Sequence, residues 1–147
     1  AAGVFSYMLS SLFITQAIAE WIGTLDVNRW VLMSFVMLFL LVAGFFLPPV
    51  AVILMAAPIL LPIITTAGFD PIWFAVVLTI NMEIGLISPP VGLNLYVING
   101  IAPDISLKTI LKGSMPFVAC MVLAIILLCF FPGLATWLPD VVMGEAI

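Results

Sequence analysis

Charged residues are scarce in this chain: they make up 7% of its 147 residues, whereas 66% of the residues are hydrophobic. A soluble domain carries roughly 25% charged residues, so this chain has too few to cover a water-facing surface. No soluble core of this length could take up so many large apolar side chains. The composition therefore predicts an all-α polytopic membrane protein whose helices face lipid.

Histidine is absent, and cysteine occurs only at Cys120 and Cys129, both inside an apolar run. The chain can therefore build neither a His-dependent catalytic triad nor a zinc site of the usual pattern. Both cysteines are best explained as small buried hydrophobic residues. The three basic residues form no basic patch, which argues against a nucleic-acid partner. We expect no enzymatic activity and no cofactor.

Five apolar blocks follow one another, separated by short polar segments. The opening stretch, AAGVFSYMLSSLF, has no initiator methionine and no basic segment, so it does not resemble a signal peptide. We expect this sequence to be a fragment of a longer protein, with further spans before Ala1. The first block predicts a helix at about 1–23, which the polar stretch TLDVNR closes.

The second and third blocks, residues 30–67, contain no charged residue and are interrupted at Pro48 and Pro49. Proline lacks an amide proton and clashes with the preceding turn, so the helix must break there. A turn exposed to water would carry polar residues, but this one is apolar on both sides. We predict a re-entrant helical hairpin at 29–67 with its tip at membrane depth. Two ordinary short spans are the alternative.

The fourth block predicts a discontinuous helix at 72–101. Its centre reads NMEIGLISPPVGLN from Asn81 to Asn94, and the glycines and prolines in it free several backbone groups. Each unsatisfied group costs several kcal/mol in hydrocarbon, so these groups must face protein, ions or water. We expect helical parts at 72–84 and 93–101 around an unwound stretch.

The last segments suggest the orientation of the chain. Residues 103–113 predict an amphipathic interfacial segment, and residues 114–138 predict the last helix. Lys108 and Lys112 then lie on one side of the membrane, and most of the acidic residues lie on the other. The positive-inside rule places both lysines in the cytoplasm and the C-terminus in the periplasm.

A hairpin followed by a broken helix is typical of secondary transporters, which bind ions and substrate near the midplane. Sodium needs hard oxygen ligands, which freed carbonyls and one hydroxyl could supply. The candidate ion-binding residues are Gly44, Leu47, Gly85, Ser88 and Pro89, and we expect no metal other than sodium. Amides at a helix start could bind a carboxylate, and the candidate substrate-proximal residues are Pro48, Pro90, Gly92 and Asn94.

Two further polar residues lie within the fourth block. Asn81 either binds an ion or forms an interhelical hydrogen bond. Glu83 is an ionisable group at membrane depth, so it is either functional or paired. It could bind a proton or cation, or it could hold the hairpin by accepting backbone hydrogen bonds.

The block from Asn81 to Leu95, with the preceding GFDP at 68–71 and PILLP at 58–62, resembles the large permease subunits of tripartite ATP-independent periplasmic (TRAP) transporters. The likeness extends over nearly the whole chain and matches the C-terminal part of such a subunit. Met115-Pro116-Phe117 and Trp137-Leu138-Pro139 fit the same pattern.

This resemblance implies the second of two inverted repeats in an ion-transporter-like, elevator-type protein of the bacterial inner membrane. It implies sodium-coupled import of organic acids such as C4-dicarboxylates or sialic acid. The implied partners are a small membrane subunit and a periplasmic substrate-binding protein.

The hairpin tip departs from the family pattern, which often has Asp and Ser or Thr where this chain has Pro48 and Val50. Its tip can offer only backbone groups, so the oxygen ligands should shift towards Ser88. Two alternatives remain open. One is a sodium–dicarboxylate or citrate carrier that needs no binding protein, and the other is a non-transporting structural membrane subunit.

Overall fold

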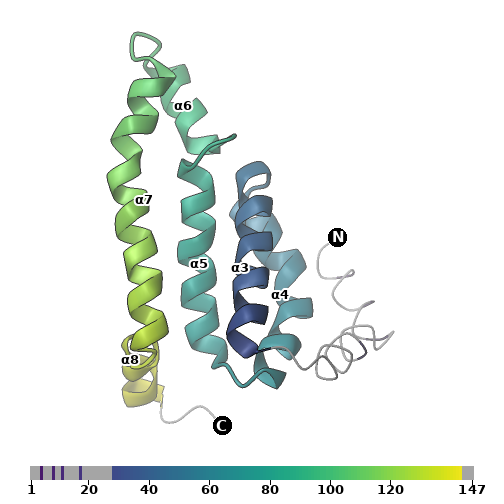
Figure 1. The fold of residues 1–147 in the computed structure, drawn as a ribbon. Helices are drawn as coiled ribbons and strands as arrows, with labels where there is room; N and C mark the ends of the chain where they lie inside the picture. Colours follow the sequence, from purple (N-terminus) through teal and green to yellow (C-terminus); the bar gives the residue numbers. More distant parts are fainter. Residues whose placement is uncertain (1–3, 5–7, 9–10, 12–16, 18–27, 144–147) are drawn as a thin grey trace.

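The computed structural model describes residues 4, 8, 11, 17 and 28–143, and every regular element within 28–143 is a helix (Figure 1). The predicted all-α class is therefore confirmed for the described part of the chain. Among the described residues, three helices are long and apolar enough to cross a membrane, namely α3 (Arg29–Phe46), α4 (Pro49–Thr66) and α7 (Leu107–Phe130). The predicted helix at 1–23 lies largely outside the described residues.

Helices α3 and α4 form an antiparallel hairpin. The Asn28 side chain caps α3 by accepting a hydrogen bond of 3.0 Å from the Trp30 amide. The helix ends at Phe46 because Pro48 and Pro49 have no backbone N–H to donate to the preceding turn. Figure 1 shows that the turn between α3 and α4 lies near the level at which α5 gives way to α6.

Helix α5 (Pro71–Ile87) and helix α6 (Leu93–Ile101) are separated by a short non-helical stretch. Asp70 caps α5 through a hydrogen bond of 2.8 Å from the Trp73 amide to its Oδ1. The helical part continues to Ile87, beyond the expected end at residue 84. Every residue between Pro71 and Pro89 still has a backbone N–H, and Pro89 is the next residue that has none to donate within the helix. The peptide bond between Pro89 and Pro90 is cis.

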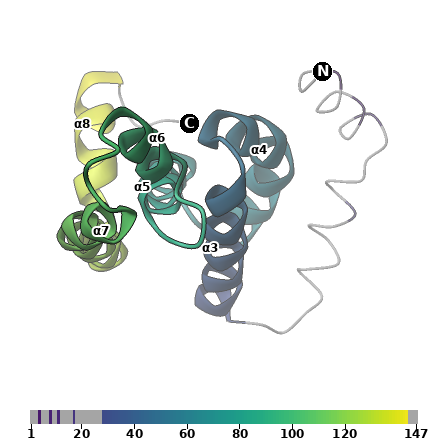
Figure 2. The same cartoon turned by 90° about the horizontal axis from the view of Figure 1, so that it is seen from above.

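Helix α7 runs back along α5 and α6, and it differs from the expected segments at both ends. It begins at Leu107, where Ser106 caps it, so Lys108 and Lys112 lie on its first turns instead of in a separate segment at 103–113. It ends at Phe130, before Pro132, and α8 (Gly133–Met143) follows. The single helix expected at 114–138 is thus two helices, and α8 turns aside from α7 (Figure 2).

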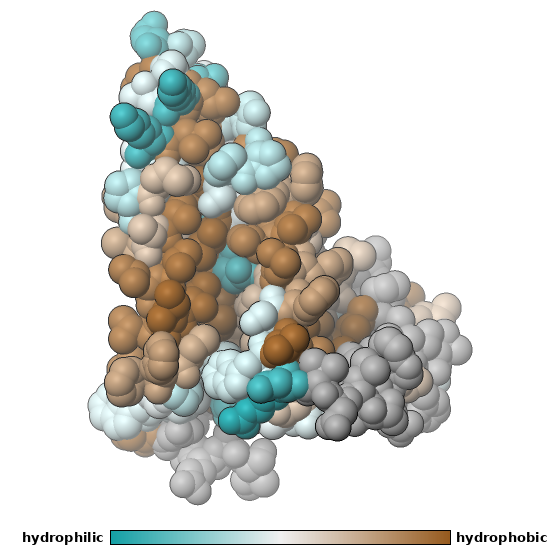
Figure 3. All heavy atoms as spheres, viewed as in Figure 1, coloured by the Kyte–Doolittle hydropathy of each residue, from teal (hydrophilic) through white to brown (hydrophobic). Residues whose placement is uncertain are grey.

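Helix α5 forms the centre of the packing, because it contacts α3, α4, α6, α7 and α8. Its side chains supply much of the core, including Trp73, Phe74, Val77, Leu78 and Met82, each at most 4% exposed. On the face that Figure 3 shows, the surface is mostly hydrophobic along the helices, and most of the hydrophilic residues lie towards the two ends. Such a distribution fits a membrane protein.

Candidate functional site

The hairpin and the broken helix touch through two glycines. A Cβ atom on Gly85 of α5 would lie 2.9 Å from the carbonyl carbon of Gly44 and 3.0 Å from its oxygen. Any side chain at residue 85 would therefore collide with the backbone of α3. Both glycines are buried. Glycine at residue 85 thus lets the two helices approach closely near their C-terminal ends, whereas a Cβ on Gly44 would make ordinary contacts, 3.4 Å from Met82 Cε and 3.7 Å from the Gly85 Cα.

The same local pattern ends both helices. Gly44 is followed by Pro48, Pro49 and Val50, and Gly85 is followed at the same spacing by Pro89, Pro90 and Val91. A helical carbonyl normally accepts from the amide four residues on, so the prolines leave the carbonyls of Gly44, Phe45, Gly85 and Leu86 without helical donors. The repeated G-x-x-x-P-P-V spacing is a sequence signal that the two helix ends form a pair. Considering each break by itself did not reveal it.

The unwound stretch from Ser88 to Gly92 is tightly turned. Gly92 has φ 56°, in the left-handed region, and a Cβ there would lie 2.9 Å from the Ser88 carbonyl oxygen and 2.8 Å from Leu95 Cδ1. Only glycine fits this position without strain. Ser88 is 7% exposed. The turn therefore keeps Ser88 at the end of α5 and sets the direction in which α6 begins.

Two side chains fix the broken helix to its neighbours. The Asn81 amide Nδ2 donates to the Met37 carbonyl of α3 at 3.0 Å, and Asn81 is 5% exposed. On the other side, the Ser114 hydroxyl of α7 lies 3.3 Å from the Ile87 carbonyl oxygen and 2.9 Å from that of Leu111. Sequence reasoning did not single out Ser114 as a site residue, because a single serine within an apolar helix has no distinguishing local pattern.

Glu83 lies on a different face of α5 from these contacts. It is exposed, as are Ala75 and Thr79, which precede it at four-residue intervals. The Thr79 hydroxyl donates to the Ala75 carbonyl within the helix at 2.8 Å. Glu83 therefore does not lie at the contact between Gly44 and Gly85.

The structure brings together some of the predicted site residues. Gly44 and Gly85 are in contact, and Ser88 and Gly92 are joined by the tight turn. Four of the others are exposed at the two breaks, and these are Leu47, Pro48, Pro89 and Pro90. Asn94 is exposed on the first turn of α6, and Gly92 caps that helix without a side-chain hydrogen bond.

A family model described as "Tripartite ATP-independent periplasmic transporter, DctM component" matches residues 1–134. The chain belongs to this DctM family. The resemblance found in the Asn81–Leu95 block is thereby confirmed.

Curated relatives of this chain include large permease proteins with two named substrates. The C4-dicarboxylate TRAP transporter large permease protein of Pseudomonas aeruginosa is 36% identical over 95% of this chain, and that of Vibrio cholerae is 36% identical over 98%. The sialic acid TRAP transporter large permease protein of Vibrio cholerae is 30% identical over 96% of this chain. The chain spans about a third of the length of these relatives, at 32%, 32% and 33% respectively.

Proposed function

We propose that this chain forms the ion- and substrate-binding C-terminal part of the large membrane subunit of a sodium-coupled secondary transporter. The transporter imports an organic acid, either a C4-dicarboxylate or a sialic-acid-like compound, which a periplasmic binding protein delivers. The names of the relatives support both substrate classes. The chain spans about a third of their length, so transport belongs to the full-length protein.

The contact between Gly44 and Gly85 is the observation that carries this proposal. It joins two helix ends at which prolines have removed the amide donors, so carbonyl oxygens without helical donors lie at two adjoining helix ends. Such oxygens are hard ligands of the kind that sodium prefers, and broken helices supply them at transporter midplanes. Gly44, Leu47, Gly85, Ser88 and Pro89 provide the candidate ion ligands, with Ser88 contributing a hydroxyl.

The substrate side of the proposal lies at the start of α6. Gly92 caps this helix without a side-chain hydrogen bond. The Leu95 amide donates to the Gly92 carbonyl at 2.8 Å, so the amides of Leu93 and Asn94 are the ones left for an anion. Pro90, Gly92 and Asn94 lie at this end, and Pro48 lies at the hairpin tip. A carboxylate bound here would be close to the sodium ligands, which provides a basis for coupling.

The wider arrangement follows the same proposal. The hairpin α3–α4 is re-entrant, and it moves with α5 and α6 as an elevator unit in the second of two inverted repeats. The height of its tip, near the break in α5–α6, supports this arrangement (Figure 1). The protein lies in the bacterial inner membrane with a small membrane subunit and a periplasmic binding protein as its partners.

Uptake by proteoliposomes tests the function. The full-length permease and its small subunit are reconstituted, and sodium and the binding protein are varied independently with labelled organic acids. We expect uptake to require both. Uptake with sodium alone would favour the binding-protein-independent carrier. Absence of uptake under every condition, from protein that remains folded, would favour a structural subunit.

The site itself is tested by removing one hydroxyl. Ser88→Ala should raise the sodium concentration needed for half-maximal uptake by about tenfold, which corresponds to about 1.4 kcal/mol of lost ligation. Thr79→Val is the matched control, because it removes a hydroxyl of α5, the helix that Ser88 caps, and this hydroxyl bonds only within α5. Equal sodium dependence in both variants would contradict the assignment of Ser88.

The depth of the hairpin tip is tested by labelling. Pro48→Cys, in a protein whose native cysteines are replaced by alanine, should react slowly with a membrane-impermeant maleimide, and sodium should slow the reaction further. Two ordinary spans would instead leave residue 48 in water, where it would react as rapidly as Lys108→Cys from the same side.

A further inference from the structure

A pocket of about 250 Å³ lies at the end of the molecule opposite to the α6–α7 turn, away from the two helix breaks. It lies between the start of α3, the turn before α5 and the end of α7. Its lining includes one cation and one carboxylate, Arg29 and Asp70, beside the rings of Trp30, Phe69 and Trp73. The transport mechanism proposed above does not use it.

The aromatic rings hold Arg29 in place. Its guanidinium carbon lies 5.8 Å from the centroid of the Trp30 ring and 5.7 Å from that of Phe69. Phe69 stacks on Trp73 at 5.3 Å, and Trp30 meets Phe69 edge-on at 5.3 Å. These cation–π contacts position the charge but leave guanidinium N–H groups as donors for an anionic oxygen.

Asp70 places a negative charge at the same pocket. Its Oδ1 accepts the capping hydrogen bond from the Trp73 amide at 2.8 Å. This bond leaves Oδ2 able to accept from a ligand, and Asp70 is exposed. The pocket thus offers one cation and one anion, which complement a small zwitterion.

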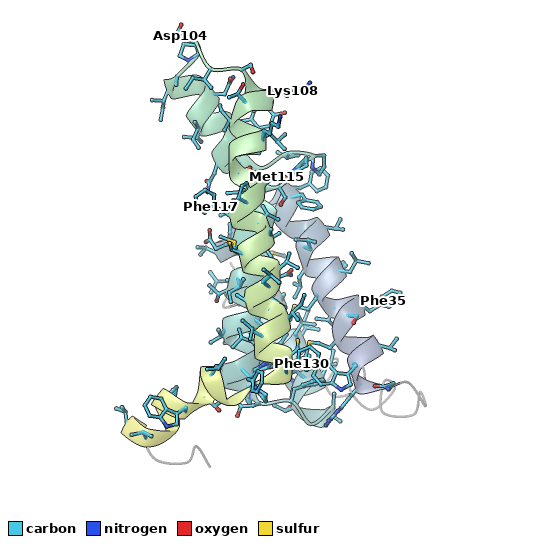
Figure 4. The ribbon with its side chains drawn as sticks, turned by 60° about the vertical axis from the view of Figure 1, so that its left-hand side comes forward. Phe35, Asp104, Lys108, Met115, Phe117 and Phe130 are labelled. Carbon is cyan, nitrogen blue, oxygen red and sulfur yellow. The ribbon has the colours of Figure 1, made fainter. Side chains whose placement is uncertain are left out.

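An apolar groove adjoins this pocket. It is a shallow, open groove of about 300 Å³ on one face of α3, lined by Val31, Phe35 and Leu38 among others, and it shares Trp30 with the charged pocket. Phe35 is 72% exposed and points away from the helices packed behind α3 (Figure 4). A charged pocket at a helix end that continues into an apolar groove along the helix matches a headgroup and an acyl chain at the membrane interface.

We propose that this pocket binds the headgroup of phosphatidylethanolamine, with the phosphate at Arg29, the ammonium at Asp70 and an acyl chain in the α3 groove. The volume is below the range of about 300–1,000 Å³ usual for whole-ligand sites, so it suits the headgroup alone. Phosphatidylglycerol has no ammonium for Asp70. The trimethylammonium group of phosphatidylcholine cannot donate a hydrogen bond to that carboxylate.

Lipid titration monitored by native mass spectrometry tests this proposal on the full-length permease purified with its small subunit. The probes are phosphatidylethanolamine, phosphatidylglycerol and phosphatidylcholine with identical acyl chains. We expect phosphatidylethanolamine to bind about threefold more tightly than either of the others, since an exposed charge pair has a modest effect. Tighter binding of phosphatidylglycerol, or equal binding of all three, would overturn the zwitterionic assignment.

Two variants separate the roles of the charges. Arg29→Gln should weaken all three lipids by about threefold, because all carry a phosphate. Asp70→Asn should remove only the preference for phosphatidylethanolamine, since asparagine still caps α5 and keeps the fold. Lys108→Gln removes an equal charge at the other end and should change nothing. An equal effect of Arg29→Gln and Lys108→Gln would overturn the site.

A final arm distinguishes a lipid from a free phosphate compound. Soluble phosphoethanolamine should not displace the lipid, because it cannot occupy the α3 groove. Leu38→Ser should weaken all three phospholipids equally by making that groove polar. Displacement by the soluble headgroup at concentrations similar to those of the lipid would show that the groove contributes nothing. None of these measurements involves uptake, so their failure would leave the proposed transport function unaffected.

Discussion

At the scale of single residues, the chain depends on glycine where two backbones meet. Gly44 and Gly85 lie 41 positions apart in sequence, yet a Cβ on Gly85 would enter the backbone of Gly44. Gly113 of α7 contrasts with Gly85, because a Cβ there would meet no heavy atom within 4 Å beyond the adjacent backbone of its own helix. The different surroundings of Gly85 and Gly113 therefore predict opposite effects on stability when either glycine is replaced by alanine.

Gly85→Ala should destabilise the full-length protein by about 1–3 kcal/mol, the usual cost of overpacking. Gly113→Ala should leave stability unchanged or raise it by about 0.5–1 kcal/mol, because alanine favours a helix. Thermal unfolding of the two purified variants measures both effects. A Gly85→Ala protein as stable as the wild type would mean that α3 and α5 do not touch at this point.

Asn81 provides a second test at the residue scale. Its hydrogen bond to the Met37 carbonyl indicates that it fastens α5 to α3. Asn81→Ala should lower stability by about 0.6–1.7 kcal/mol, between the average and the largest value measured for interhelical hydrogen bonds in a membrane protein. The sodium concentration for half-maximal uptake should stay unchanged. A large rise in that concentration would instead identify Asn81 as an ion ligand.

At the scale of helices, proline both ends an element and frees a carbonyl that another element uses. Pro132 ends α7 and cannot donate to the carbonyl of Leu128. The buried Trp73 of α5 donates its indole N–H to that carbonyl at 2.7 Å. The break in α7 is thus compensated by a contact with α5, which fixes the end of α7 beside the start of α5.

Trp73→Phe should cost about 1–3 kcal/mol, because the Leu128 carbonyl loses its donor while most of the aromatic packing remains. Trp137→Phe is the control, since Trp137 is 66% exposed on α8. Thermal unfolding of both variants measures the difference. Equal stability of the two would show that the Leu128 carbonyl finds another donor.

At the scale of the whole molecule, the hydrophilic residues mark two ends. Figure 4 shows Asp104 and Lys108 at the end of α7 opposite to Phe130, and α8 follows Phe130. A chain that carries lysines at one end and mostly acidic residues at the other should orient with its lysines in the cytoplasm.

Lys108→Cys and Trp137→Cys test this orientation in a full-length protein without its native cysteines. A membrane-impermeant maleimide added to intact spheroplasts should label Trp137→Cys and leave Lys108→Cys unlabelled. Opening the membrane should then expose Lys108→Cys. The reverse pattern would invert the proposed topology, although the packing of the helices would be unaffected.

The sequence alone determined the features that depend on neighbouring residues. Pro48 and Pro49, and Pro89 and Pro90, end helices through their own covalent structure, so the sequence alone locates both breaks. Scarce charge and long apolar runs likewise predicted a membrane protein, because burial in lipid depends on composition. The expected helix boundaries differed from the structure at residues 103–113 and 114–138, where Ser106 and Pro132 rather than hydropathy decide the ends.

Only the tertiary structure decided which of these local features meet. The contact of Gly44 with Gly85, the bond from Asn81 to Met37 and the bond from Trp73 to Leu128 join residues far apart in sequence. Each depends on the rotation and height of one helix against another. Many apolar side chains could pack at several such registers, so the hydrophobic pattern does not select one. Close glycine contacts and hydrogen bonds to specific carbonyls do select one, because they form only when the helices are aligned at those residues.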